Sequence, residues 1–187
     1  MILIATPAAA NANSYATVAD ADAYSDSRLF TDDWLTGTAD KERALAMATR
    51  LLDAFYTWTG SAVTQKQSQN LPKFAFYAWT GTPSTETQAL CWPRQGMYSR
   101  NGFAIPSGEI PQPLKDATSE FARQLLVADR SADNDIEAQG ITSIKAGPVS
   151  LTFKDMIEKK VIPDAVHSLL VPSWCIKAST PSIFEVL

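Results

Sequence analysis

Apolar side chains recur every three or four residues in several stretches of the chain, which is the spacing of one face of an α-helix. In the first stretch Thr17 is placed to cap a helix and Asp20 to complete a capping box, which predicts a helix over residues 18–29. A second helix is predicted after the Thr-Gly-Thr turn at residues 36–38. Its apolar face is formed by Leu45, Ala48, Leu52 and Phe55.

Prolines mark the starts of two further predicted helices, because proline is tolerated in the first turn of a helix. Pro111 and Pro113 begin a helix that is expected to end near Asp129. Pro163 begins a short last helix, which Pro172 ends. The apolar stripe of the longer helix consists of Leu114, Ala117, Phe121 and Leu125.

Two β-branched runs, at residues 141–144 and 149–153, lie between these two helices. They flank a turn that contains Ala146 and Gly147, and together they predict a β-hairpin over about residues 141–153. The chain is therefore predicted to be mainly α, a small helical bundle with an inserted β-hairpin and extended N- and C-terminal arms.

The chain contains one internal echo. Residues 54–60 return as residues 75–81, with six of the seven positions identical at an offset of 21 residues. Two copies are too few for a stacked repeat protein, which needs about three units. We interpret the echo as a local duplication that enlarges an aromatic loop insertion at about residues 60–87.

The residues after the last helix form an apolar tail at 171–187, and residues 1–16 form an N-terminal arm, which leaves a helical domain over residues 17–170. A tail this apolar rarely stays exposed on a monomer. It either folds back over its own core or inserts into a partner, and both alternatives stay open at this point. The docking candidates in it are Trp174, Ile176, Ile183, Phe184, Val186 and Leu187.

The composition is that of an ordinary folded protein, with 45% hydrophobic and 19% charged residues in 187. The net charge of −4 and the pI of about 5.0 have the wrong sign for phosphate binding over the whole surface, so a nucleic-acid contact would have to be local. No stretch approaches the ~20 apolar residues that span a bilayer, so no membrane partner is expected.

The sequence offers little catalytic chemistry. Cys91, Cys175 and His167 are the only soft or imidazole ligands, one short of a four-ligand zinc site. The glycine-rich loops that hold phosphates or dinucleotides do not occur in the sequence. His167 lies among apolar residues of a short helix, where a histidine is more often structural than a general base. We therefore expect a protein that is not an enzyme, with no catalytic residue, no metal and no cofactor.

Aromatic side chains concentrate in and around the echo, interleaved with Lys66 and Lys73. They are suited to stacking on single-stranded bases or to a hydrophobic contact between subunits, and the second interpretation is favoured. A Trp-Pro-Arg turn at residues 92–94 suits docking against the core or a neighbour. The candidates for subunit contacts are Trp58, Trp79, Trp92 and Arg94.

Several strings occur together, in one order, over most of residues 13–170. They are NSYAT (13–17), ATRLLD (48–53), QALCWPR (88–94), GFAI (102–105), KDA (115–117), IKAG (144–147) and IPDAV (162–166). In combination they make the chain resemble the head-tail connector, or adaptor, proteins of tailed bacteriophages. Many members of that family carry a DnaT-like single-stranded DNA-binding label.

The resemblance implies a virion structural protein that forms a ring, usually dodecameric, beneath the portal protein. Such a ring extends the DNA exit channel and joins the head to the tail. The partners it implies are the portal protein, a downstream stopper, tail or nozzle protein, and genomic DNA that passes without tight binding. The location it implies is the head-tail interface of the virion, after assembly in the bacterial host cytoplasm. The alternative, from the aromatic residues and the label, is a single-stranded DNA-binding replication accessory protein.

Overall fold

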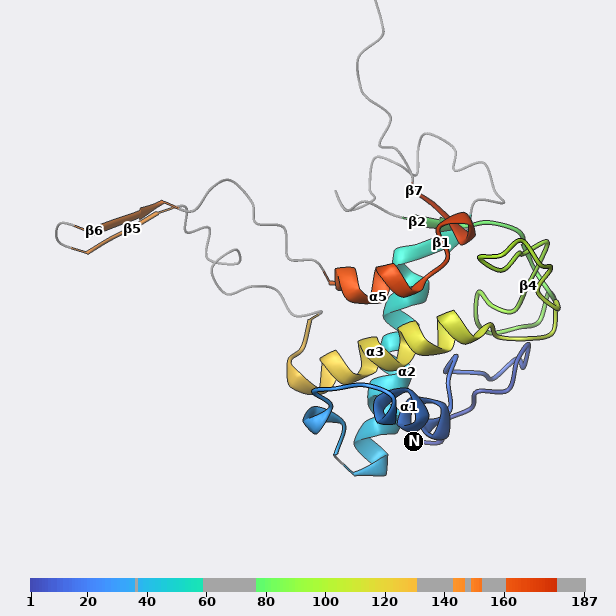
Figure 1. Cartoon of the computed structure of the whole chain (residues 1–187), viewed down its shortest axis with the longest axis horizontal. Helices are drawn as coiled ribbons and strands as arrows, with labels where there is room; N and C mark the ends of the chain where they lie inside the picture. Colours follow the sequence, from blue (N-terminus) through green and yellow to red (C-terminus); the bar gives the residue numbers. More distant parts are fainter. Residues whose placement is uncertain (36, 59–76, 131–142, 147–148, 153–160, 178–187) are drawn as a thin grey trace, which may run out of the picture.

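The fold is mainly helical, a small bundle with a β-hairpin, as the sequence predicts (Figure 1). The computed structural model describes residues 1–35, 37–58, 77–130, 143–146, 149–152 and 161–177. In chain order its elements are α1 (Val18–Asp26), η1 (Asp32–Trp34), α2 (Thr38–Phe55), β1 (Tyr56–Trp58), β2 (Tyr77–Trp79), β3 (Thr82–Pro83), β4 (Arg94–Gln95), α3 (Gln112–Val127), β5 (Ser143–Ala146), β6 (Val149–Thr152), α5 (Asp164–Leu169), η3 (Pro172–Trp174) and β7 (Cys175–Lys177).

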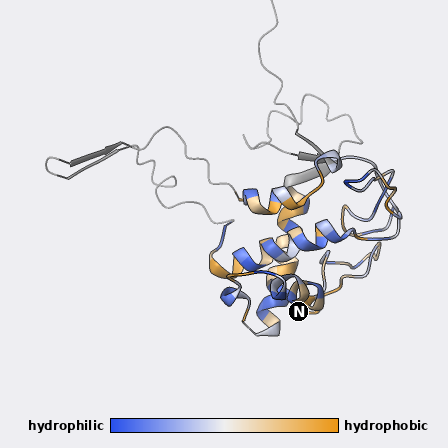
Figure 2. Ribbon diagram, in the orientation of Figure 1, coloured by the Kyte–Doolittle hydropathy of each residue, from blue (hydrophilic) through white to orange (hydrophobic). Residues whose placement is uncertain are grey.

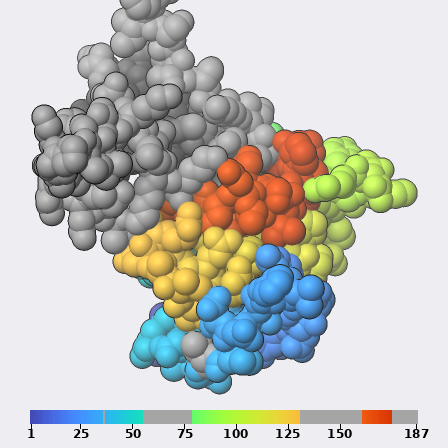
Figure 3. Space-filling model, turned by 60° about the vertical axis from the view of Figure 1, so that its left-hand side comes forward, coloured from blue at the N-terminus to red at the C-terminus, as the bar shows by residue number. Residues whose placement is uncertain are grey.

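Helix α3 is the centre of the bundle. It packs against α1, α2 and α5, and Figure 3 shows it between the α1–η1 segment and α5. Both α2 and α3 have one polar and one apolar face (Figure 2), so the apolar faces are removed from water when the helices pack. The buried residues confirm the predicted faces: Leu45, Ala48 and Leu52 on α2, and Leu114, Ala117 and Phe121 on α3.

The capping box predicted for the first helix is present. The backbone N–H of Asp20 donates to Thr17 Oγ1 (3.1 Å), and the N–H of Thr17 donates to Asp20 Oδ2 (2.9 Å). The helix ends at Asp26, three residues before the predicted Leu29. The Ser27 hydroxyl donates to the Tyr24 carbonyl (2.7 Å), which satisfies one of the oxygens that a continued helix would have used.

Three residues from each copy of the sequence echo form neighbouring strands. β1 and β2 run parallel, with Tyr56 opposite Tyr77 and Trp58 opposite Trp79, so each residue pairs with the one 21 positions later. β7 adds to β2 in the antiparallel sense, with Cys175 opposite Trp79. The order β1-β2-β7 shows that the echo builds a small sheet at the end of α2, beyond its predicted role of enlarging a loop.

The predicted β-hairpin is present. β5 and β6 pair as an antiparallel hairpin, in which Ala146 is opposite Val149, and Gly147 lies outside the described residues.

The N-terminal arm folds back on itself through paired hydrogen bonds between Ile4 and Asn13, and it ends in a buried Tyr15. Within the described part of the chain, no helix is both long and apolar enough to cross a membrane.

Candidate nucleic-acid interface

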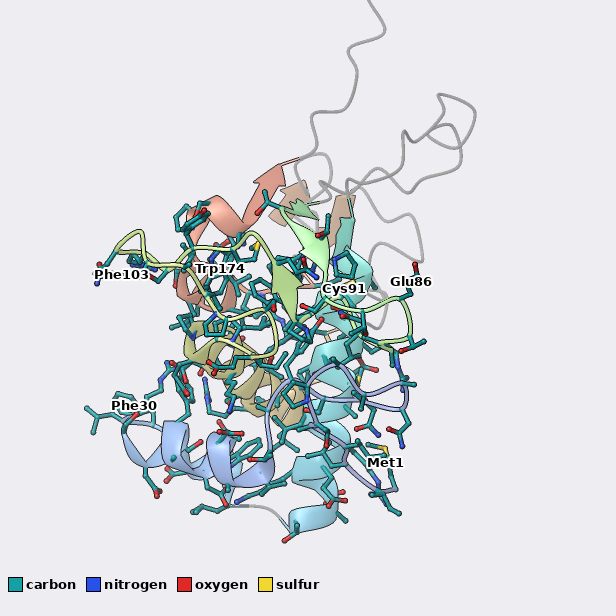
Figure 4. The ribbon with its side chains drawn as sticks, turned by 90° about the vertical axis from the view of Figure 1, so that its right-hand side faces the viewer. Met1, Phe30, Glu86, Cys91, Phe103 and Trp174 are labelled. Carbon is teal, nitrogen blue, oxygen red and sulfur yellow. The ribbon has the colours of Figure 1, made fainter. Side chains whose placement is uncertain are left out.

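A tight loop over residues 97–105 projects from the bundle between β4 and α3, with Phe103 near its tip (Figure 4). Its two sides are joined by a bridge between Tyr98 and Ala104 and by a hydrogen bond from the Ile105 N–H to the Met97 carbonyl (2.9 Å). The chain reverses between these pairs, so the residues at the turn are pushed out toward solvent. We refer to residues 97–105 as the aromatic loop.

Hydrogen bonds around Ser99 fix the turn of the aromatic loop. The Ser99 carbonyl accepts from the Gly102 N–H (2.9 Å), and the Ser99 hydroxyl accepts from the Phe103 N–H (3.1 Å). Gly102 has φ of +82°, a backbone conformation that glycine adopts without the steric cost a side chain would add. The loop is therefore a turn with a defined backbone, from which its side chains extend.

Three side chains of the aromatic loop are suited to nucleic acid. Phe103 is 73% exposed and Tyr98 is 55% exposed, although large aromatic residues are usually buried. Arg100, at the turn between them, is also exposed. Residues 87–108 contain two arginines and no acidic residue, so this stretch lacks the carboxylates that repel phosphate elsewhere in this acidic chain.

The aromatic loop is attached to the core through Trp174. The indole Nε1 of this residue donates to the carbonyl of Tyr98 (2.6 Å), and the ring is 1% exposed. Trp174 packs against Trp92 with ring centroids 5.0 Å apart, and Trp92 meets Trp79 edge to face at 5.7 Å. The exposed aromatic residues thus rest on a buried cluster of three tryptophans.

Arg94 holds the segment that precedes the aromatic loop. Its side chain is buried and donates to three backbone carbonyls: Nε to Thr80 (2.7 Å), Nη2 to Gly81 (2.8 Å) and Nη1 to Cys91 (3.0 Å). Gly81 has φ of +68°, and a Cβ there would overlap the carbonyl oxygen of Gln95. This packing leaves no room for a side chain at position 81 and fixes where the loop begins.

A buried polar group joins this segment to α2 and to the N-terminal arm. The Tyr15 hydroxyl donates to Asp53 Oδ1, and the Cys91 N–H donates to Asp53 Oδ2 (3.1 Å). Burial raises the pKa of Asp53 above its ordinary value of 3.8, although these hydrogen bonds lower it. Burial, followed by the nearby Asp53 charge, raises the pKa of the Cys91 thiol to about 12. The group is suited to holding structure and leaves Cys91 a poor nucleophile.

Comparison with known proteins assigns a family. A family model described as "Putative DnaT-like ssDNA binding protein" matches residues 1–77 and 74–184, which together cover nearly the whole chain. The chain belongs to this DnaT-like family. No curated protein and no solved structure matches it.

The expectation that this chain is a phage connector protein is therefore wrong. The family that matches is DnaT-like, and the match gives no connector family. Once that family is set aside, nothing supports the expectations that the resemblance implied. They are the virion role, the head-tail location, the dodecameric ring, and the portal and tail partners. The description of the DnaT-like family supports the alternative, a single-stranded DNA-binding accessory protein.

Three of the four residues predicted for subunit contacts lie inside this member of the DnaT-like family. Trp79 and Arg94 are 0% exposed and Trp92 is 1% exposed, so all three make their contacts within their own chain. Burial removes the apolar rings from water, and the three carbonyl acceptors of Arg94 offset the cost of burying its guanidinium. The backbone of Trp58 pairs with that of Trp79, and its side chain lies outside the described atoms.

The predicted docking tail divides at its first strand. Trp174 is part of the core and Ile176 pairs with Ala78 in the sheet, so the start of the tail follows the alternative in which it folds back. The side chain of Ile176 lies outside the described atoms. The remaining docking candidates, which also lie outside the described residues, are Ile183, Phe184, Val186 and Leu187.

Sequence reasoning did not select Tyr98, Arg100 and Phe103. The aromatic residues of the echo were the candidates for base stacking, with a hydrophobic subunit contact as the favoured interpretation, but Trp79 is buried in the core. The signal that could have found the loop is the Asn101-Gly102 pair between two aromatic residues, because Asn-Gly is a strong indicator of a tight turn. Aromatic residues beside a tight turn have few neighbours to cover them.

Proposed function

We propose that this protein is a single-stranded DNA-binding accessory protein that holds unpaired DNA on its aromatic loop. The observation that carries the proposal is the exposure of Phe103 and Tyr98 on either side of Arg100, in a turn fixed to the core by Trp174. The description of the DnaT-like family supports the same function. The proposal gives the protein a binding role without turnover, and it assigns no catalytic role to His167.

The chemistry of the aromatic loop favours single strands over duplexes. Unpaired bases offer their flat faces, on which a phenyl or phenol ring stacks whatever the base. In a duplex these faces are already stacked on one another and are not available to a surface loop. Arg100 supplies the charge for a neighbouring phosphate, and its guanidinium also stacks on bases. The loop thus provides sequence-independent contact with bases and a single cationic contact with the backbone.

The overall charge limits how tightly DNA binds. The chain has a net charge of −4, so phosphates are repelled by most of its surface. The affinity then comes from stacking, which contributes about 1–3 kcal/mol for each base. We expect weak to moderate affinity and a shallow salt dependence, as suits a protein that holds single strands briefly while other proteins act on them.

A titration of a fluorescent oligothymidine of roughly 16 nucleotides tests the proposal by anisotropy at low salt. Phe103→Ala removes one stacking ring and should weaken binding by about tenfold. Arg100→Ala should weaken binding and reduce the slope of log affinity against log salt by roughly 0.7, the contribution of one phosphate on a single strand. A duplex of the same length should bind at least about tenfold more weakly.

Two exposed residues elsewhere provide matched controls. Phe30 is 88% exposed and the side chain of Arg43 is 67% exposed, so Phe30→Ala and Arg43→Ala remove the same side chains from a surface outside the aromatic loop. Neither should change the affinity for the oligonucleotide by more than about twofold. Equal losses in the Phe103 and Phe30 variants, or equal affinity for duplex and single strand, would contradict the proposal.

A further inference from the structure

Three large apolar side chains are exposed around η1, in the segment between α1 and α2. Leu29 is 78% exposed, Phe30 88% and Leu35 82%, and they flank η1 between the end of α1 and the start of α2. Figure 4 shows Phe30 directed away from the helices, on the same side of that view as Phe103 and below it. We refer to Leu29, Phe30 and Leu35 as the apolar patch. Apolar groups gathered in this way are typical of interaction surfaces.

The apolar patch is held firmly by the elements around it. Between its residues, Trp34 is buried and donates from Nε1 to Asp22 Oδ1 (2.7 Å). Arg123 on α3 forms an ion pair with Asp33 (3.2 Å), and Arg28 forms one with the buried Glu120. These contacts attach both sides of the segment to α1 and α3, while the side chains of the apolar patch remain exposed.

The backbone at Phe30 adds a second observation. Its φ is +61°, in the left-handed region that a bulky residue rarely adopts. Since the side chain is 88% exposed, its own packing offsets little of this strain. Strained backbone is most often retained where it serves binding or catalysis. Here the unusual backbone conformation belongs to the most exposed residue of the apolar patch.

The rim of the apolar patch is acidic. Asp26 and Asp32 are exposed, and no ion pair is found for either among the residues that the structure describes. The basic side chains of the same region are already paired with carboxylates: Arg28 with Glu120, Lys41 with Asp22 and Arg43 with Asp40. The unpaired charge beside the patch is thus negative, which repels DNA and a second copy of the same patch.

We propose that the apolar patch binds an amphipathic helix of a partner protein, with apolar residues on one face and lysine or arginine on its flanks. The apolar face would cover Phe30 and its neighbours, while the basic flanks would meet Asp26 and Asp32. The elements that surround the patch are α1, η1 and α2, which offer no strand edge, so recognition takes place through side chains. This inference does not depend on DNA binding by the aromatic loop.

Two synthetic peptides test the partner chemistry on the full chain. One is a leucine–lysine amphipathic helix of about 18 residues, long enough to be helical alone, and the other replaces each lysine by glutamate. The lysine peptide, labelled and followed by anisotropy, should bind, and the glutamate peptide should bind at least about tenfold more weakly. Absence of binding by the lysine peptide, or equal binding by both, would overturn the proposal.

Variants then locate the binding on the apolar patch. Phe30→Gly should reduce lysine-peptide affinity by about tenfold while the melting temperature stays equal or rises, because glycine relieves the positive φ. Joint Asp26→Asn and Asp32→Asn changes should weaken binding at low salt and abolish most of its salt dependence. Phe103→Ala is the matched control and should bind the peptide as the unchanged protein does. Peptide binding that persists in Phe30→Gly, or that falls in Phe103→Ala, would show that the site lies elsewhere.

Discussion

The indole Nε1 of Trp174 donates a 2.6 Å hydrogen bond to the carbonyl oxygen of Tyr98. The two residues are 76 positions apart, and the bond connects the η3–β7 segment near the end of the chain to the aromatic loop. Trp174 also packs on Trp92 in the core, while Tyr98 is 55% exposed. The bond therefore joins the buried tryptophan cluster to the surface proposed to bind DNA, so the order of that surface depends on the core.

Trp174→Phe tests this connection. It keeps an aromatic ring against Trp92 but removes the indole N–H, so the Tyr98 carbonyl loses its hydrogen-bond donor. We expect a loss of about 1 kcal/mol in the free energy of unfolding and a melting temperature lower by about 2–4 °C. Oligonucleotide affinity should fall about threefold, since part of the binding energy is used to order the loop.

Trp92→Phe is the matched control for that experiment. Trp92 is equally buried, but no hydrogen bond is found for its Nε1 within the described part of the chain. Replacing it removes packing but leaves the hydrogen bond from Trp174 to Tyr98 in place, so stability should fall and oligonucleotide affinity should change little at temperatures where the protein is folded. A similar loss of DNA affinity in both variants would indicate that general destabilisation, and not the Trp174 bond, controls the loop.

The helices could be predicted from sequence because their information is local. Spacing alone predicts the buried face of α2, which consists of Leu45, Ala48 and Leu52. The pair Thr17 and Asp20 predicts a helix start. The sheet β1-β2-β7 could not be predicted, because each strand has three residues and its partners are distant in sequence. Strands this short carry no alternation of polar and apolar residues from which to infer a register.

The candidate site was missed for a related reason. A sequence alone does not show whether an aromatic residue is buried or exposed, because tertiary contacts decide this. Trp79 and Trp174 both pack on Trp92, in a cluster beside the paired strands β2 and β7, whereas Phe103 lies on a turn and is 73% exposed. The family strings found the DnaT-like label, but the connector function attached to them was wrong.

Arg94→Lys should be one of the most destabilising conservative changes in the protein. Arg94 donates to three separate carbonyls, those of Thr80, Gly81 and Cys91, through a planar fork that the single ammonium of lysine cannot reproduce. At least one buried carbonyl would lose its partner, at about 1–3 kcal/mol for each one. Chemical denaturation should show a loss of about 3 kcal/mol, compared with less than about 0.5 kcal/mol for Arg43→Lys on the surface. A loss as small as that of Arg43→Lys would show that these carbonyls find other partners.

The Cys91 thiol should be unreactive in the folded protein. Burial and the adjacent Asp53 raise its pKa to about 12, so at pH 8 the reactive thiolate is a very small fraction of the population. In a Cys175→Ser variant, which leaves Cys91 as the single thiol, the reaction with Ellman's reagent should be at least about 100-fold slower in the folded state than in denaturant. Rapid labelling of the folded variant would mean that the segment around Cys91 opens readily.

Glu120 gives the protein a specific response to acid. Burial alone would raise its pKa, but hydrogen bonds from Arg123 and Gln124 and the charges of Arg123 and Arg28 hold the pKa below the ordinary 4.5. A carboxyl group with a lowered pKa stabilises the fold above its unfolded pKa, and this contribution is lost as the pH falls through the folded value. The unchanged protein should therefore lose stability between about pH 5 and pH 3 partly through this residue.

Glu120→Gln isolates that contribution, because it keeps the shape of the side chain and removes its charge. At pH 7 the variant should lose about 2 kcal/mol in the free energy of unfolding, since Arg28 and Arg123 lose a charged acceptor in a buried position. The difference between the two proteins should shrink as the pH falls below 4.5 and through the lower pKa of Glu120 in the folded state, where the glutamate becomes neutral as well. Urea unfolding at several pH values measures this convergence. A difference that stayed constant over the whole range would show that packing, and not the charge of Glu120, fixes α1 against α3.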